Sequence, residues 1–441
     1  MKTKPNLTFW QIWNLSFGFL GVQIGYSLQN ANTSRILQSL GADVHELSYF
    51  WLAAPVAGLI VQPIVGLFSD RTWTRLGRRI PFILGGSLLA GLALLLMPNA
   101  DFFVMWMPAL LFAGMMLLFM DMAFNVTMQP FRALVADMVN DRQRTKGYAV
   151  QTFLINFGAV VGSALPFILV NVFGMSNASD SAERVPQSVA WSYYIGSAVL
   201  IGTVLVTSLR TKEYPPAQYR EYNGDCPAPA AKRPSFAELL RGLPKVMGQL
   251  AVVQFFSWFS LFLLWTYTTP AIAQNVWGTT DTASQAYNEA GDWVGVMFAV
   301  YSVFSALFSL VIVWLSNRFG NKAVYGLSLL CGALGYWGMT ELTDRWLLMV
   351  PMLGIGIAWA AILAMPYAIL SKAVRADRMG VYMGIFNFTI TLPQIVCGLS
   401  GGLLVRHIFS GDPVPMILLA GVSLLLAAVS VLFVTDKKSE S

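Results

Sequence analysis

The chain has 441 residues, of which 56% are hydrophobic and only 11% are charged. A soluble protein of this length would carry about a quarter charged residues, so the composition excludes an ordinary soluble domain. The net charge of +6 does not indicate a nucleic-acid partner, because the basic residues lie in alternate connections between apolar segments.

Apolar segments long enough to cross a bilayer follow one another along the whole chain. They predict an all-α polytopic membrane protein with twelve transmembrane helices in two six-helix bundles related by pseudo-symmetry. The first segment is as long as a full span and no small-residue cleavage site follows it, so it is counted as a helix. The expected spans are 9–30, 48–69, 80–98, 102–128, 147–173, 188–209, 246–273, 291–316, 322–341, 345–372, 379–406 and 413–435.

The distribution of basic residues predicts the topology. An even number of spans puts both termini on one side, and 24 of the 28 Lys and Arg residues fall on that side. The four on the other side are Arg35, Arg184, Arg345 and Arg406. Since cytoplasmic loops carry the excess of basic residues, we expect cytoplasmic termini and a multi-pass location in a cell membrane or bacterial inner membrane. This sorting leaves no Lys or Arg for the bilayer interior.

Internal repeats divide the chain into halves. The loop after the second span reads Ser69-Asp70-Arg71 and ends in Gly77-Arg78-Arg79, and the loop after the eighth span, 316–322, resembles it. We therefore expect an N-terminal bundle over 1–209, a cytoplasmic central loop over 210–245 and a C-terminal bundle over 246–441. Prolines at 215, 216, 227, 229 and 234 prevent a continuous helix in the central loop, and residues 235–238 fit a capping box that opens a short helix.

One acidic residue stands out among the predicted spans. Of the 22 Asp and Glu residues, only Asp121 is assigned to the interior of a span, because Asp292 and Glu341 stand at span ends and are counted with the loops. An ionisable side chain inside lipid is costly, so its default interpretation is functional. Burial disfavours the charged form, so a carboxyl group in a closing cavity can bind a proton on one side of the membrane and release it on the other. A structural carboxyl group bonded to a neighbouring helix and a sodium site are the alternatives.

Amides and tryptophans inside the spans are candidates for binding a substrate. Gln23, Ser27, Asn30 and Ser34 form one stripe of the first span, and Asn125 lies one turn after Asp121. Amides fit sugar hydroxyls, and indole rings stack on sugars, whereas helix packing and interface belts are the structural alternatives. The predicted substrate-binding residues are Gln23, Asn30, Asn125, Asn156, Trp265, Trp359 and Asn387.

Several motifs carry a family resemblance. They lie at 21–29, 55–66, 77–83, 121–137 and 383–395, and cover nearly the whole chain. Together with the six-plus-six spans they resemble the major facilitator superfamily and, within it, the plant sucrose/proton symporters and their bacterial and animal relatives. The resemblance implies that Asp121 binds the coupling proton. It also implies a cytoplasmic gate that latches the helix ends when the transporter opens outward, formed by Asp70, Arg71, Arg75, Arg78, Arg132 and Asp137.

The predicted function is proton-coupled symport of a neutral disaccharide or glucoside, of the sucrose or maltose type, into the cytoplasm by alternating access. An anionic substrate would need a buried cation, and none is assigned to a span. A proton-coupled multidrug or organic-cation exporter, a sodium-coupled sugar symporter and a non-transporting sensor are the alternatives. Both histidines are expected outside the membrane and no nucleophile lies at catalytic spacing from a base, so we expect no enzymatic activity and no metal site. We also expect a monomer without a cofactor.

Overall fold

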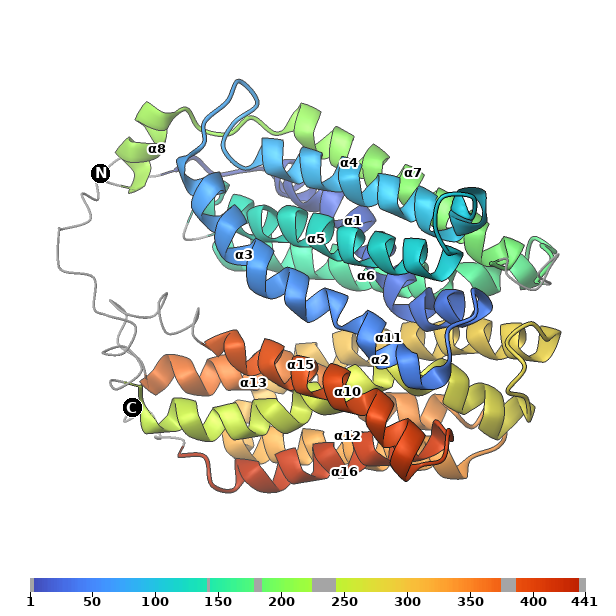
Figure 1. Cartoon of the computed structure of the whole chain (residues 1–441). Helices are drawn as coiled ribbons and strands as arrows, with labels where there is room; N and C mark the ends of the chain where they lie inside the picture. The colour runs from blue at the N-terminus through green and yellow to red at the C-terminus, as the bar shows by residue number, and fades with distance from the viewer. Residues whose placement is uncertain (1–3, 141–142, 178–184, 224–242, 374–385, 436–441) are drawn as a thin grey trace.

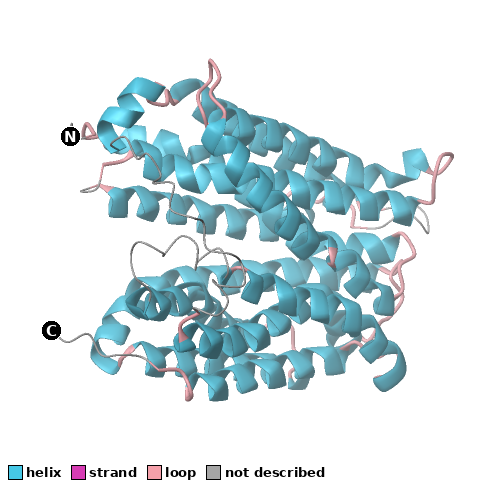
Figure 2. Ribbon diagram, turned by 60° about the vertical axis from the view of Figure 1, so that its left-hand side comes forward, coloured by secondary structure: helices cyan, strands magenta, loops and turns pink. Residues whose placement is uncertain are grey.

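The computed structural model describes residues 4–140, 143–177, 185–223, 243–373 and 386–435. These residues form helices joined by short loops, and the described part contains no strand (Figure 2). The long helices are α1 (Phe9–Ser39), α3 (Ala53–Arg71), α4 (Ile80–Leu96), α5 (Ala109–Met138), α6 (Arg144–Asn171), α7 (Gln187–Arg210), α10 (Lys245–Trp277), α11 (Gln285–Phe319), α12 (Asn321–Glu341), α13 (Met349–Ala373), α15 (Phe388–Leu403) and α16 (Val414–Val431). The short ones are η1 (Val44–Glu46), α2 (Leu47–Trp51), η2 (Met97–Phe103), α8 (Pro216–Asn223) and η4 (Leu404–Ile408).

The lengths of these helices fit a membrane. Within the described residues, ten segments are long and apolar enough to cross a bilayer. The two other long helices, α1 with 31 residues and α12 with 21, rise about 1.5 Å per residue and so also match a hydrocarbon core of roughly 30 Å. The prediction of an all-helical polytopic membrane protein is confirmed. The capping box at 235–238 lies outside the described residues.

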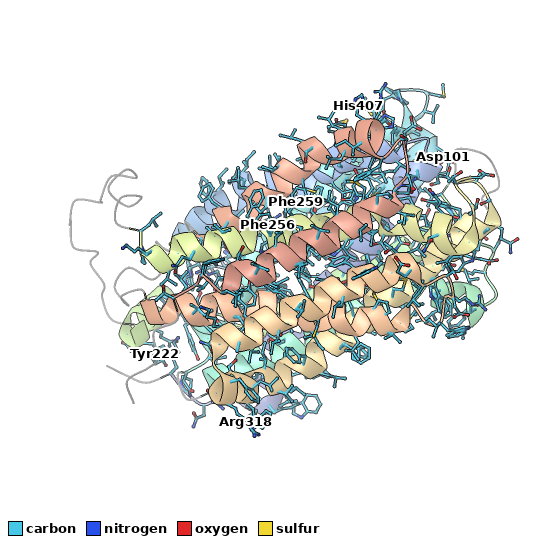
Figure 3. The ribbon with its side chains drawn as sticks, turned by 90° about the horizontal axis from the view of Figure 1, so that it is seen from below. Asp101, Tyr222, Phe256, Phe259, Arg318 and His407 are labelled. Atoms are coloured by element: carbon cyan, nitrogen blue, oxygen red, sulfur yellow. The ribbon has the colours of Figure 1, made fainter. Side chains whose placement is uncertain are left out.

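The helices form two bundles that lie side by side, α1 to α7 and α10 to α16 (Figure 1). Each bundle has its own hydrophobic core, with Phe19 and Phe131 in the first and Phe262 and Tyr325 in the second. Both termini lie at one end of the molecule, which we call the terminus end (Figure 1). Tyr222 lies at the terminus end, whereas Asp101 lies at the opposite or far end (Figure 3). Successive helices therefore run in alternating directions between the two ends.

The two bundles meet at the far end, where glycines bring backbones together. We call Gly398, Gly401 and Gly402 of α15, with the segment 45–52 that they contact, the glycine seam. A Cβ atom added at Gly402 would lie 2.1 Å from the His45 carbonyl oxygen. The Gly402 backbone N–H donates to Ser48 Oγ at 2.8 Å. Side chains at these glycines would force the bundles apart, so the glycines serve close packing of the helices.

Three helices extend at least six residues beyond a predicted bound. The first span was expected to end at residue 30, but α1 continues to Ser39 and contains Arg35. Helix α5 continues to Met138 and contains Arg132. Helix α11 begins at Gln285, so Asp292, which stood at the edge of the predicted span and was counted with the loop acids, lies well inside a helix. The prediction that the helices carry no basic residue, and no acid besides Asp121, is therefore wrong. A side chain that packs against another helix can be polar if it has a hydrogen-bond partner there. Such residues lower the hydropathy of the segment, so a span predicted from hydropathy ends before the helix does.

Candidate functional site

Asp121 lies on α5 in the interior of the first bundle, where its side chain is 2% exposed. Gln29 of α1 donates a hydrogen bond from Nε2 to Asp121 Oδ1 at 2.6 Å. The other carboxylate oxygen, Oδ2, has no hydrogen-bond partner in the described structure, and neither has Gln29 Oε1. The described part of the chain also places no basic side chain in a salt bridge with Asp121. Asp121 is thus a buried acid whose side chain accepts one hydrogen bond, from the neutral amide of Gln29.

Amide side chains extend this site to a third helix. Asn125, one turn after Asp121, donates from Nδ2 to the Asp121 carbonyl oxygen at 2.8 Å. Gln62 of α3 donates from Nε2 to Asn125 Oδ1 at 2.8 Å. The sequence analysis included Asn125 but missed Gln29 and Gln62. Gln29 lies six residues after Gln23, which puts it off the polar stripe of α1 and directs it toward α5.

Three indole rings gather in the second bundle. Trp258 and Trp265 are seven residues apart on one face of α10, and Trp359 on α13 completes the group. Their ring centroids are 5.9 to 6.4 Å apart. The indole N–H groups of Trp258 and Trp265 are buried without a hydrogen-bond partner in the described structure. This tryptophan cluster brings the predicted residues Trp265 and Trp359 together and leaves two donors available.

Two tyrosines connect Asp121 with the tryptophan cluster. Tyr26 of α1 packs edge-to-face on Phe124, with ring centroids 5.7 Å apart, and lies within electrostatic range of Asp121. Tyr26 is also within electrostatic range of Tyr301 on α11, which lies beside Trp265. These two tyrosines therefore lie between the acid of the first bundle and the indoles of the second.

The remaining predicted substrate residues have different surroundings. Gln23 donates to Ser27 Oγ at 3.2 Å within α1. Asn30 and Asn156 are half-buried, and Asn387 is exposed immediately before α15. The hydrogen bonds of Gln23 do not connect it to Asp121.

A buried ion pair joins the bundles at the far end. Arg35 NH1 of α1 lies 2.5 Å from Asp292 Oδ1 of α11, with exposed side-chain fractions of 0% and 4%. Arg35 also donates to Asn288 Oδ1 at 3.1 Å and to Asn177 Oδ1 at 2.8 Å. Asn177 Nδ2 donates to Asp292 Oδ2 at 2.7 Å. The sequence analysis placed Arg35 in an external loop, whereas the structure uses it as a contact between bundles.

A second charged cluster lies at the terminus end, within the first bundle. Asp137 Oδ2 accepts from Arg78 NH2 at 2.5 Å and from Arg79 Nε at 3.0 Å. Tyr219 of α8 donates to Asp137 Oδ1 at 3.2 Å. Glu213 Oε1 accepts from the Arg79 backbone N–H at 2.7 Å, and its burial raises the pKa of the Glu213 carboxyl group above the ordinary value. Of the predicted gate residues, Arg78 and Asp137 are therefore in direct contact.

The other predicted gate residues lie apart from this contact. Asp70 and Arg71 end α3, and their side chains are outside the described part. Arg75 is exposed in the loop. Arg132 lies inside α5, within electrostatic range of Tyr26 and of Tyr367 on α13, so it faces the interface between bundles.

Nothing in this site resembles a metal centre, because the described residues contain no group of three His, Cys, Asp or Glu side chains that could hold an ion. Two helical bundles with polar groups buried at their interface are the architecture of a membrane transporter. Solved structures of similar fold are transporters too. The D323A mutant of the nucleoside transporter NupG has a TM-score of 0.72 at 15% identity, covering 96% of this chain and 99% of its own. The inward-open xylose transporter XylE from E. coli has a TM-score of 0.65 at 14% identity, covering 98% and 96%.

The chain belongs to the MFS/sugar transport protein family, whose profile matches residues 36–412. It is 23% identical to the sucrose transport protein SUC4 of Arabidopsis thaliana, over 87% of this chain and 81% of that protein. It is 24% identical to the sucrose transport protein SUT1 of Oryza sativa subsp. japonica, over 95% and 86%. The general alpha-glucoside permease of Schizosaccharomyces pombe is 29% identical over 58% of this chain and 46% of its own length. The expected family is confirmed, and the chain is a membrane transporter rather than an enzyme.

Proposed function

We propose that this transporter carries a neutral disaccharide or glucoside together with a proton into the cytoplasm, and that Asp121 binds the proton. The observation that carries the proposal is the state of this carboxyl group. It is buried, has no cation beside it in the described structure, and keeps one oxygen without a partner. Such a group can bind a proton when a cavity closes over it and release the proton when water returns.

The side chains at the bundle interface fit a neutral, hydroxyl-rich substrate. The tryptophan cluster offers aromatic faces for the apolar side of a sugar ring and two indole donors for its hydroxyls. Arg35 is not available to an anionic substrate, because Asp292 and two asparagines occupy its guanidinium. Relatives named as sucrose transport proteins and an alpha-glucoside permease support the same substrate class.

We also propose that this conformation is inward-facing. The hydrogen bonds between the bundles lie at the far end, where Ser34, Arg35 and Ser48 contact the second bundle. The terminus end carries the basic loops, which supports a cytoplasmic position for both termini. Contact at the far end closes the external side of a transporter that works by alternating access.

The test is uptake of radiolabelled sucrose and maltose into proteoliposomes under an imposed proton gradient. One proton moving through about 100 mV supplies about 2.3 kcal/mol, enough for roughly 50-fold accumulation of a neutral solute. Asp121→Asn should abolish this accumulation and retain sugar exchange. Full accumulation by Asp121→Asn would refute the assignment. Accumulation driven by sodium instead, or efflux of an organic cation in place of sugar uptake, would refute the proposed coupling or substrate.

The tryptophan cluster has its own test. Trp265→Ala or Trp359→Ala should lower sugar affinity about two- to tenfold, since an aromatic contact contributes about 0.5 to 1.5 kcal/mol. Trp314→Ala on α11 is the matched control, because that indole is exposed on the outside of the bundle. Sugar affinity that is unchanged in both cluster variants would remove the tryptophans from the binding site.

A further inference from the structure

Within the residues that the structure describes, Gln29 and Asp121 each have a buried side-chain oxygen without a hydrogen-bond partner, and one added proton would let these two oxygens bond to each other. A single hydrogen bond of 2.6 Å joins them, and each keeps a buried oxygen without a partner in the described structure. Both side chains are buried, Gln29 with 1% exposure and Asp121 with 2%. Buried polar atoms nearly always have partners, so two unpartnered oxygens on adjacent groups require an explanation.

The two oxygens lack the same thing, a donor. An ionised carboxylate only accepts hydrogen bonds, and the carbonyl oxygen of a glutamine side chain also only accepts. A proton on Asp121 Oδ2 turns that oxygen into a donor. A carboxylic acid and a carboxamide can then form two parallel hydrogen bonds, one from N–H to the acid carbonyl and one from O–H to the amide carbonyl.

We propose that Gln29 positions the coupling proton by forming this paired contact with protonated Asp121. Nε2 donates to Oδ1, as in the structure, and the protonated Oδ2 donates to Gln29 Oε1. The proton enters from water and returns to water, and no covalent bond other than O–H forms or breaks. Because Gln29 belongs to α1 and Asp121 to α5, separating these helices would remove the second bond and favour release. The inference rests on the proposed role of Asp121.

Among the residues that the structure describes, no charged side chain pairs with Asp121. Helix α5 packs against α1, α3, α4, α6 and η2. Titratable residues on these elements and on α5 itself are Tyr26 and Arg35 on α1, Asp70 and Arg71 on α3, Asp101 on η2, Arg132 and Asp137 on α5, and Arg144, Lys146 and Tyr148 on α6. Tyr26 is within electrostatic range of Asp121. Arg35 is bonded to Asp292, and Arg132 lies eleven residues along α5, or about 16 Å of helix. Tyr301 of the opposite bundle lies behind Tyr26.

The pH dependence of sugar uptake tests the inference, because the two possible roles of Gln29 predict opposite signs. Gln29→Met keeps the shape of the side chain and removes both hydrogen bonds. If the amide stabilises the protonated acid, the uptake profile of Gln29→Met moves toward acidic pH by about one unit, a tenfold loss in proton affinity. A shift toward alkaline pH would mean that Gln29 only donates to the ionised carboxylate, and it would overturn the inference.

Infrared spectroscopy gives a second readout that a merely structural role would not move. The pH-dependent carboxyl C=O band that disappears in Asp121→Asn should shift to higher wavenumber in Gln29→Met, as its hydrogen bond is lost. Gln29→Leu, which also lacks the amide, should shift the band and the pH profile in the same directions as Gln29→Met. It keeps the inference testable if Gln29→Met does not fold, since a wild-type band and profile in Gln29→Leu would contradict it.

The outcomes separate the two proposals. If Asp121→Asn retains proton-driven accumulation, the proposed function and this inference both fall. If Asp121→Asn loses accumulation while Gln29→Met keeps the wild-type profile and band, only the role of Gln29 is refuted.

Discussion

Two carboxylates are buried in the described helices of this transporter, and their surroundings differ. Asp292 lies at the far end with a guanidinium on one oxygen and an amide on the other. Asp121 lies deeper in the first bundle with one amide and one unpartnered oxygen. A carboxylate that a buried cation holds remains ionised, whereas one without a cation can change its protonation. The first group therefore suits a fixed contact between bundles, and the second suits a coupling site.

The largest expected effect comes from removing the cation. Arg35→Met leaves Asp292 buried without its charge partner and should destabilise the protein by about 3 to 5 kcal/mol. Thermal unfolding of the detergent-solubilised protein measures the loss. The double variant Arg35→Met with Asp292→Leu should regain most of the stability, because no uncompensated charge remains. A single variant as stable as the wild type would show that the ion pair is not what holds this contact.

Asn177→Ala should have an intermediate effect. Asn177 bonds to both members of the ion pair, so its removal leaves one donor of Arg35 and one oxygen of Asp292 short of a partner. We expect a loss of about 1 to 3 kcal/mol in the same unfolding measurement. Asn171→Ala is the control, because its amide is exposed and bonds only within its own helix. Equal effects of the two substitutions would contradict the special role of Asn177.

Asp121→Asn should have the smallest effect on stability, less than about 1 kcal/mol, despite abolishing accumulation. The substitution leaves no cation unpaired, and the new amide can still accept from Gln29 while donating to Gln29 Oε1. The measurement compares the melting temperatures of Asp121→Asn and Arg35→Met with that of the wild type. A loss as large as that of Arg35→Met would identify Asp121 as a structural residue and end the contrast between the two acids.

Apolar segments and repeats were enough to predict the helical architecture, because lipid imposes length and apolarity on each helix. They also located Asp121 and Asn125, which stand out as polar residues in an apolar run. They failed at Arg35, because the polar stretch around Asn32 and Thr33 lies buried inside the protein rather than in lipid. They also counted Asp292, at the edge of its predicted span, with the loop acids. A single sequence also contains no signal that pairs residues 257 positions apart.

The missed partner Gln29 has a different cause. The polar stripe from Gln23 to Ser34 was treated as one surface, but Ser34 bonds the Thr266 carbonyl of the second bundle and Gln23 bonds within α1. Which face of α1 meets α5 depends on how the helices rotate in the bundle, and helix periodicity alone does not determine that rotation. Trp265 and Trp359 were predicted as indoles inside apolar spans. The structure adds Trp258, which lies seven residues before Trp265 and so on the same side of α10.

The glycine seam has a consequence for electrical leakage. Where α15 meets the segment 45–52, main-chain atoms lie so close that no side chain could be added at Gly402. Because main-chain atoms make this contact, closure of the far end does not depend on side-chain rotamers. We therefore expect the same barrier to form in every transport cycle. The proposed proton coupling would need such a barrier, because a passage for hydrated ions would discharge the gradient that drives uptake.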